Sequence, residues 1–324
     1  MSAATVAAGR PRRIDAAWIA RSGLAAWIIV ALMVVGLTIA EPEGFWAAAN
    51  LANVLTACVV LGLVALGQNV VVLTGGIDLA VGSTATLSAM LTAILIDGYP
   101  IRTLPAILAV LLAGAVIGVA HGLLVGRVKL APFVVTLATF YLLQGIAFMI
   151  STSPTGQVTT ALTDLAIERV GPLPLSFGAL VIGVVIVALL MRSTVFGRHV
   201  YAVGGDEEAA RANGVPVVRT LVGAYVLCGV LAAAAGVVLA SRATLGSPTA
   251  GQGLELSAIT VVVVGGTSLL GGRGTITGTL GGVALLALIE SSFTLLQAPA
   301  TLTDLIRGVV ILAAAAVFVQ RSRR

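Results

Sequence analysis

The chain has 324 residues, of which 59% are hydrophobic and only 10% are charged, and its mean hydropathy is +1.11. Soluble domains carry about 25% charged residues, so this composition excludes a soluble globular protein and indicates an integral membrane protein. Eighteen Lys and Arg outnumber thirteen Asp and Glu, a basic surplus that we attribute to membrane topology and not to nucleic-acid binding.

The apolar runs are too long for β-barrel strands and have the length of membrane helices, about 20 residues each. We therefore predict an all-α integral membrane protein with about ten transmembrane helices, several of them broken at glycine motifs. Cys58 and Cys228 lie inside apolar runs, so we expect two buried free thiols and no disulfide. The predicted spans are 22–40, 51–73, 77–96, 104–125, 132–150, 174–191, 220–240, 256–270, 275–296 and 302–320.

Charge at the ends of these spans predicts their orientation. A basic tail (1–21) precedes a single polytopic transmembrane domain (22–320), and a second basic tail (321–324) follows it. The first run is too long for a signal peptide and is followed by acidic residues, so we predict an uncleaved span. One side of the membrane would hold Arg102, Arg169, Arg242 and Arg307. The other would hold Arg10, Arg12, Arg13, Arg21, Arg127, Lys129, Arg192, Arg198, Arg211, Arg219, Arg273, Arg321, Arg323 and Arg324.

This asymmetry follows the positive-inside rule and makes both termini cytoplasmic. The segment 192–219 is then a cytoplasmic loop, and it has the signals of a short helix. Gly204-Gly205 interrupts the chain, Asp206 is a good N-cap, and Gly214 suits a left-handed C-cap before Pro216. Acidic residues fill the first turn and strong helix formers follow: Glu207, Glu208, Ala209, Ala210 and Arg211. Such a helix is too short to be stable alone, so we expect the membrane domain or a partner to hold it.

Two apolar stretches are interrupted by glycine in a similar way, VVVLTGGIDLAVGS (70–83) and VVVVGGTSLLGGRG (261–274). The similarity is typical of transporters built from structural repeats, although close packing of small residues explains many glycines equally well. Asp78 follows the first break, where it can cap a helix from Leu79 or take part in gating. The candidate gating and pathway residues are Gly75, Gly76, Asp78, Gly82, Gly265, Gly266 and Glu290.

Two ionisable residues lie inside predicted spans. Glu290 is about halfway along the span 275–296, and an acid near the bilayer midplane is costly and usually functional or paired. His121 is better interpreted as a hydrogen-bonded packing residue than as a ligand. The outer loops, including 151–171 and 242–255, are too small to be separate domains.

Several kinds of chemistry are absent from the sequence. It has no phosphate-binding loop, since its only lysine is Lys129, and its two His and two Cys are too far apart to predict a metal site. No nucleophile triad is present. We therefore predict a protein that is not an enzyme and that has no cofactor.

Four segments together resemble one family: 67–83 (GQNVVVLTGGIDLAVGS), 126–139 (GRVKLAPFVVTLAT), 196–215 (FGRHVYAVGGDEEAARANGV) and 251–279 (GQGLELSAITVVVVGGTSLLGGRGTITGT). They are similar, in order and spacing, to permease subunits of bacterial ABC importers of the ribose/xylose/galactose type. Ala80 and the segment 290–296 depart from the family pattern, which leaves the exact sugar open. By resemblance, the ATPase-coupling residues are Arg198, Tyr201, Gly204, Gly205, Asp206, Glu207, Ala209, Ala210, Arg211 and Gly214.

The resemblance also implies partners: cytoplasmic ABC ATPase subunits, an extracytoplasmic sugar-binding protein, and a second copy or a sister permease in the bacterial cytoplasmic membrane. No nucleic acid is expected. Three alternatives remain open. The same architecture serves for a nucleoside, a polyol or a branched-chain amino acid, Glu290 makes a proton-coupled carrier conceivable, and a non-transporting scaffold ranks last.

Overall fold

The computed structural model describes residues 24–171, 173–297 and 308, and this part of the chain is almost entirely helical. One short antiparallel pair, β1 (Arg169–Val170) with β2 (Leu173–Pro174), accompanies the helices. In chain order the helices are α2 (Leu24–Ala40), α3 (Pro42–Trp46), α4 (Ala48–Leu73), α5 (Val81–Ile96), the 3₁₀ turn η1 (Pro100–Arg102), α6 (Thr103–Gly126), α7 (Pro132–Ile150), α8 (Thr160–Ile167), α9 (Phe177–Ser193), α10 (Val195–Gly205), α11 (Glu207–Ala212), α12 (Val217–Ala243), α13 (Leu254–Val264) and α14 (Ile276–Leu295).

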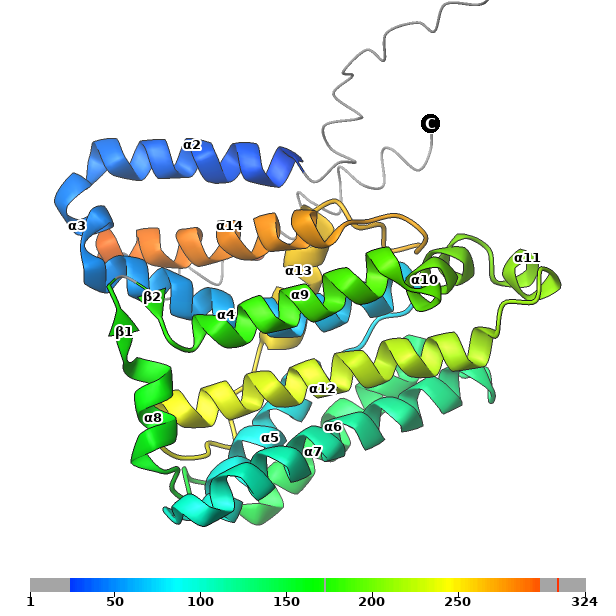
Figure 1. The fold of residues 1–324 in the computed structure, drawn as a ribbon, viewed down its shortest axis with the longest axis horizontal. Helices are drawn as coiled ribbons and strands as arrows, with labels where there is room; N and C mark the ends of the chain where they lie inside the picture. The colour runs from blue at the N-terminus through cyan, green and yellow to red at the C-terminus, as the bar shows by residue number, and fades with distance from the viewer. Residues whose placement is uncertain (1–23, 172, 298–307, 309–324) are drawn as a thin grey trace, which may run out of the picture.

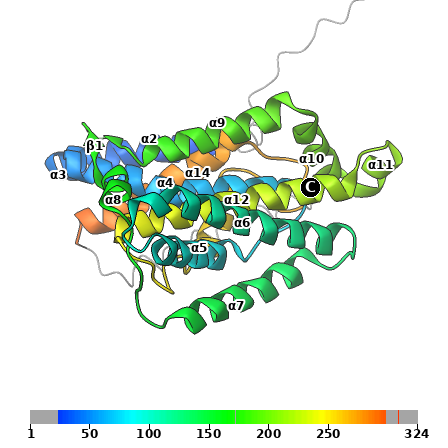
Figure 2. The ribbon, with the colours of Figure 1, turned by 60° about the horizontal axis from the view of Figure 1, so that its bottom comes forward.

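The long helices run side by side as a bundle (Figure 1). Helices α10 and α11 lie at one end, here called the α11 end, and α3, α8 and the β1–β2 pair lie at the opposite end, here called the α8 end (Figure 1). Figure 2 shows α7 on the outside of the bundle. Most of its large apolar side chains are exposed, as expected for a helix that faces lipid or a partner.

Within the described residues, five segments are long and apolar enough to cross a membrane: α4, η1 with α6, α7, α12 and α14. A sixth crossing is possible if α9 and α10, which bend by 74° at the break between them, form one broken span. This supports a multi-pass membrane protein but only part of the prediction of about ten spans. The predicted span 302–320 and the tails 1–21 and 321–324 lie outside the described residues.

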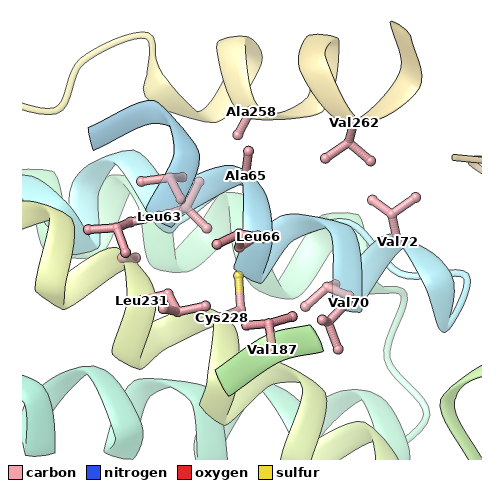
Figure 3. Close-up of a cluster of buried hydrophobic side chains, with 14 of the residues drawn as sticks. Leu63, Ala65, Leu66, Val70, Val72, Val187, Cys228, Leu231, Ala258 and Val262 are labelled. Atoms are coloured by element: carbon pink, nitrogen blue, oxygen red, sulfur yellow. The ribbon is translucent and has the colours of Figure 1, made fainter. Parts of the chain in front are cut away.

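Helix α4 lies at the centre of the core because its side chains are apolar on all sides. Figure 3 shows Ala65 and Leu66 of α4 between Ala258 of α13 on one side and Cys228 of α12 on the other. Both predicted free cysteines are confirmed as buried and unpaired. Glycines four residues apart on α6 let α12 approach closely, since a Cβ at Gly114 would lie only 2.8 Å from the Cβ of Ala233.

Two apolar helices are too short to cross a bilayer alone. At 1.5 Å per residue, the 16 residues of α5 and the 11 of α13 reach about 24 and 17 Å, against about 30 Å of hydrocarbon. The predicted spans 77–96 and 256–270 were therefore too long. The chain leaves the helix at both glycine pairs, because Gly75 and Gly266 have φ of +83° and +89°, which interrupts a regular helix.

Candidate functional site

The segment between α9 and α12 contains two helices where the sequence predicted one. Helix α10 begins at the N-cap Thr194, whose Oγ1 accepts a hydrogen bond from Gly197 N at 3.4 Å. Its Val200 and Val203 are buried, which anchors it against the bundle. The sequence predicted that Gly204-Gly205 would interrupt the chain. In the structure these two residues instead form the last turn of α10.

Helix α11 confirms the predicted caps. Asp206 Oδ1 accepts a hydrogen bond from Ala209 N at 2.9 Å, which satisfies an otherwise free donor in the first turn. At the other end, Gly214 N donates to Arg211 O and Val215 N donates to Ala210 O, both at 3.0 Å. This pair of bonds is a Schellman motif, and it requires the φ of +80° that Gly214 adopts.

One carboxylate connects α11 to the turn between α6 and α7. Glu207 Oε1 pairs with Lys129 Nζ and, at 2.7 Å, with Arg211 Nη2. The pKa of Glu207 is lowered mainly by the hydrogen bond from Lys129 and to a smaller extent by the hydrogen bond from Arg211. These three residues, with Glu208 and Ala212, line an open hollow of about 540 Å³. The α11 end therefore presents a polar, partly preformed surface around a short helix.

The two alanines of α11 differ in exposure. Ala209 is exposed, whereas Ala210 is 5% exposed and packs in the core. Of the two alanines predicted to couple to the ATPase, only Ala209 is therefore open to direct contact with a partner. The small side chain of Ala210 is needed inside the protein, because it lies opposite Val215 at the closing turn of the helix.

Three glycine segments that are far apart in the sequence meet beside α10, and we call them the glycine junction: Gly75, Gly204-Gly205 and Gly271-Gly272. Gly272 N donates to Leu73 O at 2.9 Å, which joins the loop after α13 to the end of α4. A Cβ at Gly204 would overlap Leu73 O and would lie 2.6 Å from Gly272 N. Backbone therefore packs directly on backbone there, which only glycine permits.

A second contact links α10 to the same loops. Tyr201 Oη donates to Gly274 O at 3.0 Å. A Cβ at Gly271 would lie 2.8 Å from Gly75 N and 2.7 Å from Gly204 O. The sequence identified the two glycine motifs and the segment 196–215 as separate segments. The fold brings parts of all three into contact.

Asp78 belongs to a buried polar cluster and is not the N-cap of α5. The N-cap position is Ala80, and Asp78 Oδ1 accepts a hydrogen bond from Ala80 N at 2.9 Å in the turn before the helix. With its amide oriented to satisfy both partners, Gln68 donates to Asp78 O at 3.0 Å and accepts from Asp78 N at 3.2 Å. These bonds fix the turn between α4 and α5.

His121 faces the same carboxylate. Its Nδ1 lies 3.4 Å from Asp78 Oδ2, without the geometry of a hydrogen bond, and both side chains are almost fully buried. Its ring also meets Tyr225 edge-on, with centroids 5.8 Å apart. His121 is therefore a buried packing residue, as predicted, but it lies beside an acid and its ring makes no hydrogen bond to the described part of the chain.

The remaining candidates are placed elsewhere. Gly265 packs on Gly278 of α14, and Thr267 Oγ1 beside it donates to Asn69 Oδ1 at 2.8 Å. Gly82 packs against Glu255. Glu290 is the fifteenth of twenty residues in α14, nearer the α8 end than expected, and it precedes Ser291, whose Oγ donates to Asn50 Oδ1 at 2.9 Å.

Sequence reasoning missed helix α10, and it placed Glu255 at the end of an outer loop although the residue lies in the first turn of α13. The pattern Phe196, Val200, Val203 recurs at helical spacing and was the signal for α10. Within the described residues, no group of three or more His, Cys, Asp or Glu could hold a metal ion.

The apolar crossings and the interrupted helices define a multi-pass membrane protein of the transporter type. Residues 50–315 match the family described as "Branched-chain amino acid transport system / permease component", and the chain belongs to this permease family. It is 36% identical to the ribose import permease protein RbsC of Bacillus subtilis over 291 residues, 87% of this chain and 88% of that protein.

Other relatives carry different sugar names. The chain is 34% identical to the L-arabinose ABC transporter permease protein AraH of Azospirillum brasilense, covering 91% of this chain and 86% of that protein. It is also 34% identical to the fructose import permease protein FrcC of Rhizobium meliloti, covering 90% and 83%. No solved structure matches the chain.

Proposed function

We propose that the chain is the transmembrane permease subunit of an ABC importer that carries a monosaccharide across the bacterial cytoplasmic membrane. Two copies, or this chain and a sister permease, would enclose the pathway. Cytoplasmic ATPase subunits would supply the work, and an extracytoplasmic binding protein would deliver the sugar. The relatives support this class of solute, because several that match most of the chain are named for ribose, arabinose or fructose.

The distribution of charge supports a cytoplasmic α11 end. In the described part of the chain, Arg102, Arg169 and Arg242 lie at the α8 end. The α11 end holds Arg127, Lys129, Arg192, Arg198, Arg211, Arg219 and Arg273. Cytoplasmic loops carry such an excess of cations, which supports docking of partner ATPases at α10 and α11.

The observation that carries the proposal is the contact of α10 with both glycine-broken segments. A load on α11 passes to α10 through a single residue, Asp206, and α10 packs by backbone on Leu73 and Gly272. In the proposed mechanism, movement of α10 displaces the turn between α4 and α5, the turn between α13 and α14, or both. This is how nucleotide-driven closure of the ATPases would reach the pathway, since the chain itself has no phosphate-binding loop.

Ala209→Arg tests the docking role of α11. Because Ala209 is exposed, the larger cation should leave the fold intact but prevent a close-fitting partner from binding. We expect ATP-driven uptake in proteoliposomes to fall at least tenfold, with less ATPase co-purifying and the thermal midpoint of the isolated permease unchanged. The matched control is Ala161→Arg, an exposed alanine of α8 at the opposite end, which should keep ATPase binding. Normal uptake by the Ala209→Arg variant would contradict the proposal.

The family description favours one second candidate, a branched-chain amino acid as the solute. Uptake by the complete transporter, with radiolabelled ribose, arabinose, fructose and leucine compared in parallel, separates the two. A proton-coupled carrier through Glu290 would instead show uptake driven by a pH gradient with the ATPase left out.

A further inference from the structure

The segment between α12 and α13 turns from the α8 end back into the bundle. Near its start, Gly246 exchanges two backbone hydrogen bonds with Thr155, at 2.8 and 2.9 Å, at the α8 end. Five residues later, Gly251 packs on Gly82 in the first turn of α5, and its amide donates to Thr86 Oγ1 in the second turn at 2.9 Å. Helix α13 therefore starts inside the bundle, and Figure 1 shows it between the two ends. The sequence had placed residues up to 255 in an outer loop.

The depth of Glu255 follows from its neighbours. Ala258 of α13 lies opposite Ala65 of α4 (Figure 3), and Glu255 is almost one turn earlier on α13. Val262 of α13 likewise lies near Val72 (Figure 3), so later residues of α13 lie nearer the C-terminal end of α4. Glu255 is thus level with the middle of the 26-residue helix α4.

The carboxylate of Glu255 is only half satisfied. Its Oε1 accepts a hydrogen bond from Gly253 N at 3.2 Å, while its Oε2 is buried and has no hydrogen-bond partner. The same oxygen occupies the space that a Cβ at Gly82 would need. The adjacent Gln252 is exposed, so two strongly polar side chains lie at mid-depth, one of them on the open surface of the protomer.

Such a surface is unsuited to lipid. Charged and amide groups at mid-bilayer are costly unless they face water, a partner or a buried counterpart. The surface beside Gln252 and Glu255 therefore faces the interior of the assembled transporter. No Lys or Arg occurs between 244 and 264 or in α5, so this surface has no cation that could bind an anionic solute.

We propose that Glu255 and Gln252 form a solute-contacting site midway along the transport pathway, for a neutral polyhydroxy solute of monosaccharide size. The carboxylate accepts hydrogen bonds from hydroxyl groups, and the amide of Gln252 both donates and accepts. An amino acid would bring a carboxylate of its own, for which this surface offers no cation. The site rests on the proposed function and names the solute chemistry that the pathway accepts.

The test uses the complete transporter in proteoliposomes, with its ATPase and binding protein and whichever of ribose, arabinose or fructose the wild type takes up best. Glu255→Gln keeps the size of the side chain and removes its charge. We expect uptake to fall at least tenfold, while ATPase activity stimulated by the binding protein stays within twofold. Gln252→Ala should also lower uptake with ATPase activity unchanged. The control Glu43→Gln, an exposed acid of α3, should behave as wild type.

A second measurement separates contact with solute from a structural role. Both native cysteines are buried, so a Gln252→Cys variant carries one exposed thiol. It should react with a membrane-impermeant thiol reagent, and saturating sugar with the binding protein should slow this reaction. Labelling by lipid-soluble reagents alone, unchanged uptake in Glu255→Gln, or equal loss of ATPase activity and uptake would each overturn the inference. A wild-type complex that moves no sugar with ATP would instead contradict the proposed function.

Discussion

Gly204→Ala is expected to abolish ATP-driven uptake, whereas Gly205→Ala, one residue later on the same helix, should leave it intact. The Cβ added at Gly204 would overlap the carbonyl of Leu73 and crowd the amide of Gly272, while a Cβ at Gly205 meets nothing within 4 Å. The crowded atoms belong to backbone, which cannot turn away as a flexible side chain does. Overpacking of this kind costs about 1–3 kcal/mol, and it would separate α10 from both loops of the glycine junction.

Helix propensity acts in the opposite direction and is too small to compensate. Alanine is more favourable than glycine within a helix by about 0.5–1 kcal/mol, so Gly205→Ala should be neutral or slightly stabilising. Thermal midpoints of the purified permease in detergent, measured beside uptake in proteoliposomes, give both quantities. If the two variants behave alike, the glycine junction does not transmit movement and the proposed mechanism loses its main support.

The long crossings of the fold were predictable from the sequence. Local composition is sufficient there, because a run of about 20 apolar residues has few alternatives in a bilayer. The predicted span 132–150 coincides with α7 (Pro132–Ile150), and α4, α6, α12 and α14 lie within a few residues of their predicted bounds. The broken helices were less predictable. Apolar composition continues past Gly265, so local composition alone does not indicate that α13 ends at Val264.

The candidate site also has features that the sequence could predict and features that depend on the fold. The caps of α11 are local chemistry, and Asp206 and Gly214 were recognisable from their neighbours in sequence. Exposure is a tertiary property, so Ala209 and Ala210 looked equivalent until the fold buried one of them. Depth in the membrane is tertiary as well. Glu290 stood out because it interrupts an apolar run, while Glu255 looked like the end of a loop until the chain was seen to turn inward.

His121→Ala is the second change with a large expected effect, and it concerns stability. It would leave the carboxylate of Asp78, which is 3% exposed, without the imidazole that lies 3.4 Å away. A buried polar group that loses a polar neighbour costs about 1–3 kcal/mol, because water cannot replace that neighbour. The lost edge-on contact with Tyr225 adds to this cost.

Asp78→Asn is the informative companion variant. Its amide oxygen can still accept the hydrogen bond from Ala80 N, and the charge that His121 faces is gone. If the pair is coupled as its distance implies, the double variant will be more stable than the sum of the two single changes predicts, by about 1–3 kcal/mol. Chemical unfolding of the four proteins in the same detergent measures this coupling. Strict additivity would mean that His121 contributes through packing against Tyr225 alone, and that Gln68 and Ala80 hold the turn between α4 and α5 without help from His121.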